Sequence, residues 1–339
     1  MNIREVAKRA GVSTATVSRV VNGTVPVTSR TERRVREAIK TLGYFPNSHA
    51  RTLGSGKSHM YGLIISDITN PFFPDIAKGF ERIAVEHGQE LLIANTDYQP
   101  QRMQVCVRRM LERKVDGVAI MTSEMDPKLV QLLNKRGIPI VFLDTGKVGR
   151  MTSNIFIDYD GGIELAIDHL VSLGHRRIAF VSGPQSLPSA KTRTDAFLRS
   201  LKKRGIKIGP EYIVTGDHHI DGGKAATEKL LKLPNPPTAV LASNDLSAIG
   251  VMGAVHEAGL RVPEDISVVG FDDIELSSFL YPPLSTVHVP RAEIASRAFT
   301  ALYNASHKGV DHGVEYRVST ELIVRQSTAA VKNGALAKP

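Results

Sequence analysis

The feature that most constrains the fold is an alternation of short apolar segments with stretches of helical periodicity, repeated along most of the chain. The apolar segments are rich in Val, Ile, Leu or Phe, and most end in small or polar residues. This alternation predicts parallel β-strands covered by helices. Two successive groups of segments predict a bilobed α/β body. Their sequences are YGLIISD, ELLIANTD, GVAIM, IPIVFLD and NIFID within residues 61–158, then RIAFVSG, YIVTG, TAVLASND and ISVVGFDD within residues 177–273.

Polar side chains gather where these expected strands end. In open parallel sheets, ligands bind beyond the carboxyl ends of the strands. The two lobes should therefore enclose a binding cleft lined by such residues. The polar strand ends are Ser66-Asp67, Asn95-Thr96-Asp97, Asp144-Thr145, Asp158, Ser182-Gly183, Gly216-Asp217, Ser243-Asn244-Asp245 and Asp272-Asp273.

Residues 1–46 predict a separate all-α head of three short helices. Apolar residues at positions 3, 6, 7 and 10 share one face of the first helix. Gly11 ends that helix, and Ser13 caps a second one that runs through TATVSRVVN. A third helix begins near residue 28 or 29 and stops at Gly43. Two short helices joined by a tight turn, with a third behind them, form a helix-turn-helix; the alternative is a generic three-helix bundle.

The head is strongly basic, whereas the body is almost neutral. The whole chain has a formal net charge of +9. Residues 1–60 hold 11 Lys and Arg against 3 Asp and Glu, a net charge of +8, and the other 279 residues hold 32 against 31. A basic patch confined to one domain is the electrostatic mark of a nucleic-acid-binding module. We therefore expect only the head to contact double-stranded DNA.

In a helix-turn-helix the second helix enters the major groove and presents its N-terminal residues to the base edges. Thr14, Ala15 and Thr16 occupy that first turn, and Arg19 lies one turn further along. An arginine can donate two hydrogen bonds to guanine, the commonest specific contact, although Arg19 could also be a solvated surface residue. Phosphate contacts, which position the protein without reading sequence, are expected from Ser13 and Asn22.

The stretch IREVAKRAGVSTATVSRVVNG, followed by GYFPNSHARTL, resembles the head of the lactose-repressor/galactose-repressor (LacI/GalR) family of bacterial transcription regulators. The resemblance continues through NPFF at 70–73, DGVAI at 116–120, GHRRIAFVSGP at 174–184, ASNDLSAIG at 242–250, VPEDISVVGFDD at 262–273 and PPLSTVHVP at 282–290. It implies a homodimeric repressor or activator that binds a pseudo-palindromic operator. It also implies a body like that of periplasmic sugar-binding proteins, made of two parallel-sheet subdomains.

The resemblance further implies how the chain is divided. Residues 1–46 would be the DNA-binding domain, 47–60 a hinge helix or linker, and 61–339 the effector-binding and dimerisation domain. In the hinge, Asn47 and Ala50 would lie against DNA, and Leu53 would be an apolar wedge in the minor groove; a flexible linker without DNA contact is the alternative. The N-lobe would comprise about 61–160 and 291–321, and the C-lobe about 161–289 and 322–330.

The cleft between the lobes is the effector site that the resemblance implies. The N-lobe would contribute Asp67, Phe72 and Phe73, and Asp144 and Asp158 are weaker candidates. The C-lobe would contribute Arg193, His218, Asn244 and Asp272. An apolar wall with a few fixed donors and acceptors suits a sugar or a purine. Several acids and one arginine favour a sugar, whereas a purine, a nucleoside or a partner protein remains the alternative.

Other classes of protein fit the sequence less well. The single cysteine, Cys106, allows neither an internal disulfide nor a cysteine-based metal cluster, and His218-His219 lacks a third ligand, so no metal or cofactor is expected. No dinucleotide-binding, Walker or nucleophile-elbow motif supports an enzyme on a doubly wound fold. A transport binding protein would need a secretion signal, but charged residues begin at Arg4. We expect a cytoplasmic protein without a membrane span.

Overall fold

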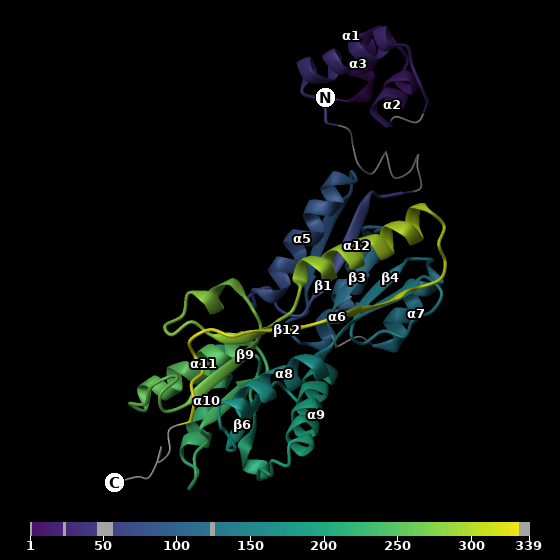
Figure 1. The fold of residues 1–339 in the computed structure, drawn as a ribbon. Helices are drawn as coiled ribbons and strands as arrows, with labels where there is room; N and C mark the ends of the chain where they lie inside the picture. Colours follow the sequence, from purple (N-terminus) through teal and green to yellow (C-terminus); the bar gives the residue numbers. More distant parts are fainter. Residues whose placement is uncertain (1, 23–24, 46–56, 123–125, 332–339) are drawn as a thin grey trace.

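The computed structural model describes residues 2–22, 25–45, 57–122 and 126–331. It places a small helical head beyond one end of a body made of two α/β lobes (Figure 1). The expected fold class, a helix-turn-helix head on a bilobed body with parallel sheets, is confirmed.

The head consists of α1 (Ile3–Ala10), α2 (Thr14–Asn22) and α3 (Ser29–Leu42). Asn2 and Glu5 form the capping box of α1, and Gly11 ends the helix at a φ of 61°, in the left-handed region that glycine adopts without strain. One small core holds the three helices together. Its buried members are Val6, Ala7, Ala10, Val17, Val35 and Ala38.

The N-lobe is a parallel sheet of six strands with helices on both faces. Its strand order is β11-β5-β4-β3-β1-β2, and every pairing is parallel. Its strands are β1 (Met60–Ile65), β2 (Glu90–Asn95), β3 (Gly117–Met121), β4 (Ile140–Leu143), β5 (Thr152–Ile157) and β11 (Glu315–Val318). Its helices are α5 (Phe72–Glu86), α6 (Pro100–Glu112), α7 (Pro127–Lys135) and α12 (Arg291–His307).

The C-lobe repeats this plan with strand order β12-β10-β9-β8-β6-β7. Its pairings are parallel except for β12, which runs antiparallel to β10. Its strands are β6 (Ile178–Ser182), β7 (Ile213–Thr215), β8 (Ala239–Ala242), β9 (Ser267–Asp272), β10 (Ser285–His288) and β12 (Glu321–Ile323). Its helices are α8 (Tyr159–Ser172), α9 (Pro188–Lys203), α10 (Ile220–Leu231) and α11 (Asp245–Glu257), with short 3-10 turns at Pro210–Tyr212 and Glu275–Ser278.

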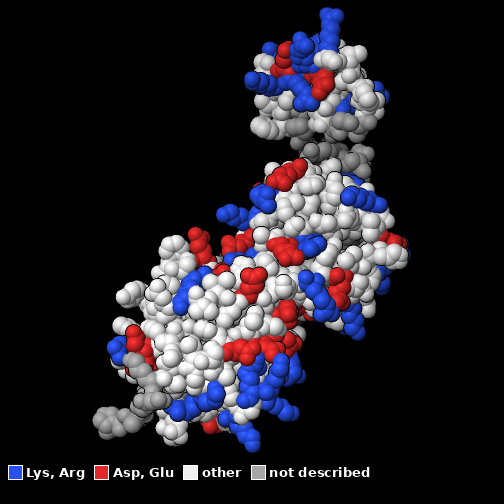
Figure 2. Space-filling model, in the orientation of Figure 1, with Lys and Arg blue, Asp and Glu red and all other residues white. Residues whose placement is uncertain are grey.

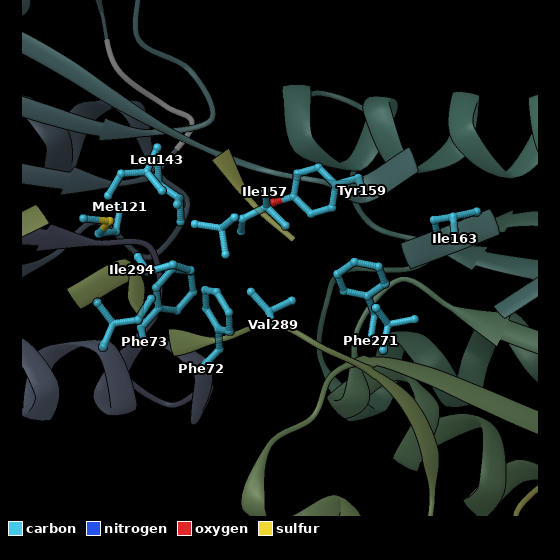
Figure 3. Packing of buried hydrophobic residues seen from close by; sticks show 14 of the residues in the cluster. Phe72, Phe73, Met121, Leu143, Ile157, Tyr159, Ile163, Phe271, Val289 and Ile294 are labelled. Carbon is cyan, nitrogen blue, oxygen red and sulfur yellow. The ribbon is translucent and has the colours of Figure 1, made fainter. Parts of the chain in front are cut away.

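The chain passes between the lobes three times. It leaves the N-lobe after β5, returns after β10 to form α12, and leaves again between β11 and β12. Apolar side chains fill the junction that these passages create. In Figure 3, Phe72 and Phe73 of α5 face Phe271 of β9, and Val289 lies between them. The lobes therefore share a buried junction at the base of the cleft, in addition to their separate cores.

Candidate functional site

The first turn of α2 is exposed on the surface of the head. Ser13 caps the helix: its hydroxyl accepts a hydrogen bond from the Thr16 backbone N–H at 3.1 Å. Ser13, Thr14, Ala15 and Arg19 are exposed, and Thr16 is half-buried. These side chains are therefore accessible to a DNA duplex. In Figure 2, basic side chains, with a few acidic ones among them, gather on the part of the head farther from the body.

The other residues that were expected to contact DNA lie at the end of α2 or beyond the described head. Asn22 is the last residue of α2, and its side chain lies outside the described part of the structure. The hinge residues Asn47, Ala50 and Leu53 also lie outside the described residues.

The lobes enclose a cavity of about 530 Å³, including the part open to solvent. Strand and helix ends from both lobes line it. Of the residues expected from the sequence, the cavity brings together Phe72, Phe73, Asp144, Arg193, His218, Asn244 and Asp272. Additional lining comes from Ser66, Asn70, Tyr98, Met121, Thr122, Leu143, Tyr159, Leu187 and Ser189.

Arg193 of α9 is the buried cation of this cavity. Its Nη1 donates to the Ser243 carbonyl at 2.5 Å, and its Nη2 donates to the Tyr159 hydroxyl at 3.4 Å. The guanidinium also stacks over two rings, at 4.6 Å from the centroid of Tyr159 and 4.9 Å from that of Phe271. Its Nε is buried without a hydrogen-bond partner. Such an orphaned donor costs about 1–3 kcal/mol until an acceptor reaches it.

Asp272, at the end of β9, is the opposing carboxylate. Burial raises its pKa to about 8, although Arg193 and Arg291 both favour the charged form. Its φ of 116° is in a region that non-glycine residues rarely adopt. The neighbouring backbone is held by the buried Asp245 carboxylate, which accepts from the Ile274 N–H at 2.8 Å and from the Ser277 hydroxyl. The structure thus fixes Asp272 in place.

Asp144 and Tyr159 form a hydrogen-bonded pair on the wall of the cavity. The Tyr159 hydroxyl donates to the Asp144 carboxylate at 2.6 Å, and the Ile157 N–H donates to its other oxygen at 2.8 Å. Desolvation raises the pKa of Asp144 to about 6 and also raises that of Tyr159. With its donor engaged by Asp144, the Tyr159 oxygen can still accept from Arg193.

His218 and Asn244 form a second polar group on the C-lobe side. The Asn244 amide donates to the His218 carbonyl at 2.9 Å, and its oxygen caps α11 by accepting from the Ser247 N–H. His218 Nδ1 lies 3.2 Å from the Ser243 hydroxyl. A Cβ at position 183 would stand 2.0 Å from His218 Nε2, so Gly183 is needed for the imidazole to fit. Desolvation lowers the pKa of His218 to about 3, so the ring is neutral.

Two expected site residues lie outside the cavity. Asp67 turns back on its own loop, where one oxygen accepts from the Thr69 N–H at 2.8 Å and the other lies 3.7 Å from His219 Nδ1. Asp158 is exposed and caps α8 through the Gly161 N–H at 2.9 Å. In each case a nearby backbone amide binds the carboxylate, which leaves Asp158 exposed and Asp67 buried beside His219 of the C-lobe.

The sequence reasoning missed Tyr159, Tyr98 and Asn70. Tyr159 immediately follows Asp158, the residue expected in the site from the sequence. Neighbouring side chains at a strand end point in different directions, so a difference of one position decides which of them faces the cavity. Asn70 lies in the NPFF motif, where its side chain accepts from the Phe72 N–H at 3.1 Å and orients the start of α5. The NPFF motif therefore contained the information that could have identified Asn70, whereas no local sequence pattern pointed to Tyr98.

Comparisons with known proteins agree with this architecture. A family model described as "Bacterial regulatory proteins, lacI family" matches residues 2–47, and one described as "Periplasmic binding protein-like domain" matches residues 167–328. The repressor PurR of Pasteurella multocida is 34% identical over 328 residues, covering 96% of this chain and 98% of that protein. The chain belongs to the LacI family. Its head is thus the DNA-binding domain of a transcription regulator.

Two further comparisons extend this result. The ribose operon repressor of Escherichia coli K12 is 36% identical to this LacI-family chain over 301 residues, covering 88% of the chain and 91% of the repressor. A crystal structure of the Lac repressor dimer bound to operator and the anti-inducer ONPF superposes with a TM-score of 0.86 at 30% identity, covering 97% of this chain and 99% of that one. These relatives are transcriptional repressors.

None of the described helices is both long and apolar enough to cross a bilayer. Within the same part of the chain, no group of three or more His, Cys, Asp or Glu side chains is arranged to hold a metal ion.

The buried imidazole of this LacI-family protein generates a prediction about acid stability. The pKa of His218 is about 3 in the folded state, whereas the ordinary value is about 6.5. As the pH falls below about 6.5, His218 therefore gains a proton in the unfolded chain but not in the folded chain. The contribution of the neutral His218 ring to stability is therefore lost in that range, whereas the raised pKa values of Asp144 and Asp272 act with the opposite sign. In thermal melts, His218→Gln should cost stability at pH 7, and its difference from wild type should shrink between pH 7 and 4.5. The control His312→Gln, at an exposed ring, should keep the wild-type slope; equal slopes for all three would refute the assignment.

Proposed function

We propose that this chain is a dimeric repressor whose operator affinity is set by a small polyhydroxylated molecule, a sugar, bound between the lobes. One observation carries the proposal: a buried guanidinium with an orphaned Nε and a buried carboxyl group, that of Asp272, whose side-chain oxygens take part in no hydrogen bond among the described residues, face one cavity. Each sugar hydroxyl both donates and accepts. A sugar can therefore donate to Asp272 and place an oxygen at Arg193, and so satisfy both groups.

The opposite wall of the cavity fits the same class of ligand. Phe72 and Phe73 lie at 5.2 Å in an edge-to-face arrangement, so they present one ring face and one ring edge. A sugar has apolar C–H faces that pack on such a wall while its hydroxyls reach the polar side. Because the aromatic wall belongs to the N-lobe and Arg193 and Asp272 to the C-lobe, a bound sugar contacts both lobes.

This bridging supplies the basis of control. A ligand shifts a conformational equilibrium only by its difference in affinity for the two states. A sugar that contacts both lobes binds most tightly at one interlobe angle, and the N-lobe is continuous with the linker to the head. The coupling between effector and operator is expected to be about 1–3 kcal/mol, typical of allosteric proteins.

A purine is the second candidate, because an apolar wall with a few fixed donors and acceptors also suits a planar base. Thermal-shift measurements with D-ribose, other pentoses and hexoses, and the free purine bases separate the two. Stabilisation by a sugar supports the proposal. Stabilisation by a purine base alone replaces the sugar, and no stabilisation by any compound favours control by a partner protein.

Arg193 is the residue on which effector affinity should depend. Arg193→Lys keeps the charge but removes the planar fork that contacts both the ligand and Tyr159. Loss of one charged hydrogen bond costs about 1.5–3 kcal/mol, so the Kd for the compound found in the screen should rise at least tenfold by calorimetry. Arg199→Lys, an exposed change on the same helix, is the matched control and should leave the Kd unchanged. A change below threefold for Arg193→Lys contradicts the assignment.

At the other end of the molecule, Arg19 is proposed to read a base edge. Arg19→Ala should cost about 1–3 kcal/mol on the best duplex recovered from a randomised pool and should relax the base preference at one position. Fluorescence anisotropy with single-base variants of that duplex measures both effects. Lys40→Ala, at an exposed site on α3, should lower affinity for all sequences alike. An unchanged base preference in Arg19→Ala rules out base reading.

A surface patch on the C-lobe supports the dimer. Leu276, Phe279 and Tyr281 lie within six residues of one another, with 50%, 77% and 98% of their surface exposed. A contiguous set of exposed large apolar side chains marks an interaction site. A second copy of the chain is the occupant we propose, since the Lac repressor structure it resembles is a dimer.

The dimer proposal predicts the effect of one substitution. Tyr281→Asp should produce monomers at micromolar concentration in sedimentation velocity, because a carboxylate would be buried against its symmetry mate. Operator affinity should fall with it. Leu198→Asp, at a partly exposed residue of α9, should remain dimeric. A dimeric Tyr281→Asp would exclude this patch from the interface.

A further inference from the structure

The end of the N-lobe that faces the head carries a second cluster of basic side chains, which we call the basic end patch. Because the sheet is parallel, the first residues of its strands and the last residues of its helices all lie at this end. The helices α6 and α7 finish here, with Arg113 and Arg136 as their C-caps. The patch consists of Lys57, Arg113, Lys114, Lys135 and Arg136.

The basic end patch surrounds a hollow of about 930 Å³ lined by Lys57, Lys114 and Arg136. Asp116 is the one acidic residue among the described residues that line it. Its carboxylate is already engaged, because it accepts hydrogen bonds from the Ser58 N–H at 2.9 Å and the His59 N–H at 2.8 Å. The hollow therefore has a positive lining whose single carboxylate is held by backbone donors.

The patch cations differ from several of those on the C-lobe. On the C-lobe, Arg199, Arg204 and Lys224 each form an ion pair with Asp or Glu. At the patch, within the described part of the chain, the side chains of Arg113, Lys114, Lys135 and Arg136 form no ion pair or hydrogen bond. Lys57 is held in place by donation to the Ser306 carbonyl at 2.9 Å.

Helix capping does not account for these cations. Basic residues are favoured near helix C-termini because they interact with the last carbonyl groups. None of the four unpaired side chains donates to a carbonyl in the described structure, and Lys57 belongs to no helix. The exposed side chains of Arg113, Lys114, Lys135 and Arg136 therefore form a set of unpaired cations at one end of the N-lobe.

The position of the patch indicates its partner. Residue 57 is the first described residue after the linker, and only residues 46–56 separate it from the head. A segment of that length spans at most about 40 Å when fully extended. In Figure 1 the head lies beyond this end of the N-lobe. DNA held by the head is therefore kept near the patch, and duplex phosphates are the dense negative charge that such a surface binds.

We propose that the basic end patch is a second DNA-contact surface, which binds backbone phosphates of the duplex held by the head. This inference rests on the DNA-binding function of the head and, contrary to the expectation that only the head contacts DNA, adds a contact from the body. The contact carries no base specificity. It adds affinity and salt dependence, and it makes DNA binding sensitive to the orientation of the N-lobe.

The test uses the full-length protein and a 40-base-pair duplex of random sequence, with binding followed by anisotropy from 50 to 200 mM salt. Each phosphate contact contributes about 0.9 to the slope of log K against log salt. Lys114→Glu/Arg136→Glu should lower affinity at least tenfold at 50 mM salt and reduce the slope by about 2–4 in a dimer. The control Lys202→Glu/Lys229→Glu makes the same charge change at exposed C-lobe positions and should have less than a threefold effect.

The outcomes separate the inference from the proposed function. If the two double variants behave alike, the patch does not touch DNA and the inference is wrong. If wild-type protein binds no duplex, the proposed function fails as well. Thermal melts confirm that both variants fold. If inorganic phosphate stabilises wild type but not Lys114→Glu/Arg136→Glu, while DNA affinity is equal in both, the hollow binds a small anion and the inference is overturned.

Discussion

Parallel strand pairing is the constraint on which the rest of this structure depends. In a parallel sheet every strand ends at the same edge, so the polar residues that follow the strands gather there. Both lobes turn that edge toward the cleft, which brings Asp144 of one lobe within reach of Arg193 of the other. The opposite edge of the N-lobe collects the helix C-termini. Parallel pairing thus places the cavity between the lobes at one edge of the N-lobe sheet and the basic end patch at the opposite edge.

Burial of charge would give the proposed effector cavity its selectivity. A guanidinium and two carboxylates taken out of water carry a desolvation cost that their mutual attraction offsets only in part. The raised pKa of Asp272 and the orphaned Nε of Arg193 are two expressions of that cost. An apolar ligand would leave it in place. A ligand with donors and acceptors at the right positions recovers it, so the buried polar groups of the cavity favour one class of ligand over another.

Much of this architecture follows from the sequence, because local signals and tertiary structure agree. The Asn2–Glu5 capping box and Gly11 fix α1, and the apolar runs mark the strands β1 to β9 along the chain, although not their order within each sheet. The orientation of individual side chains at the strand ends does not follow. Asp158 caps α8 whereas its neighbour Tyr159 faces the cavity. The Asp158 cap is a local contact with an amide three residues on, which a helix-start signal could have indicated. The position of Tyr159 depends on Asp144 and Arg193, which are distant in the sequence.

The three passages between the lobes determine what an effector can control. Rotation of one lobe must be absorbed near residues 157–159, 288–291 and 318–321, and two of these segments contribute directly to the junction around the cavity. Tyr159 begins α8 immediately after the first passage, while its hydroxyl links Asp144 to Arg193. A ligand that engages Arg193 therefore acts on a residue at the pivot itself. Its effect on lobe orientation needs no long chain of intermediates, because the binding contact and the pivot are one hydrogen-bonded group.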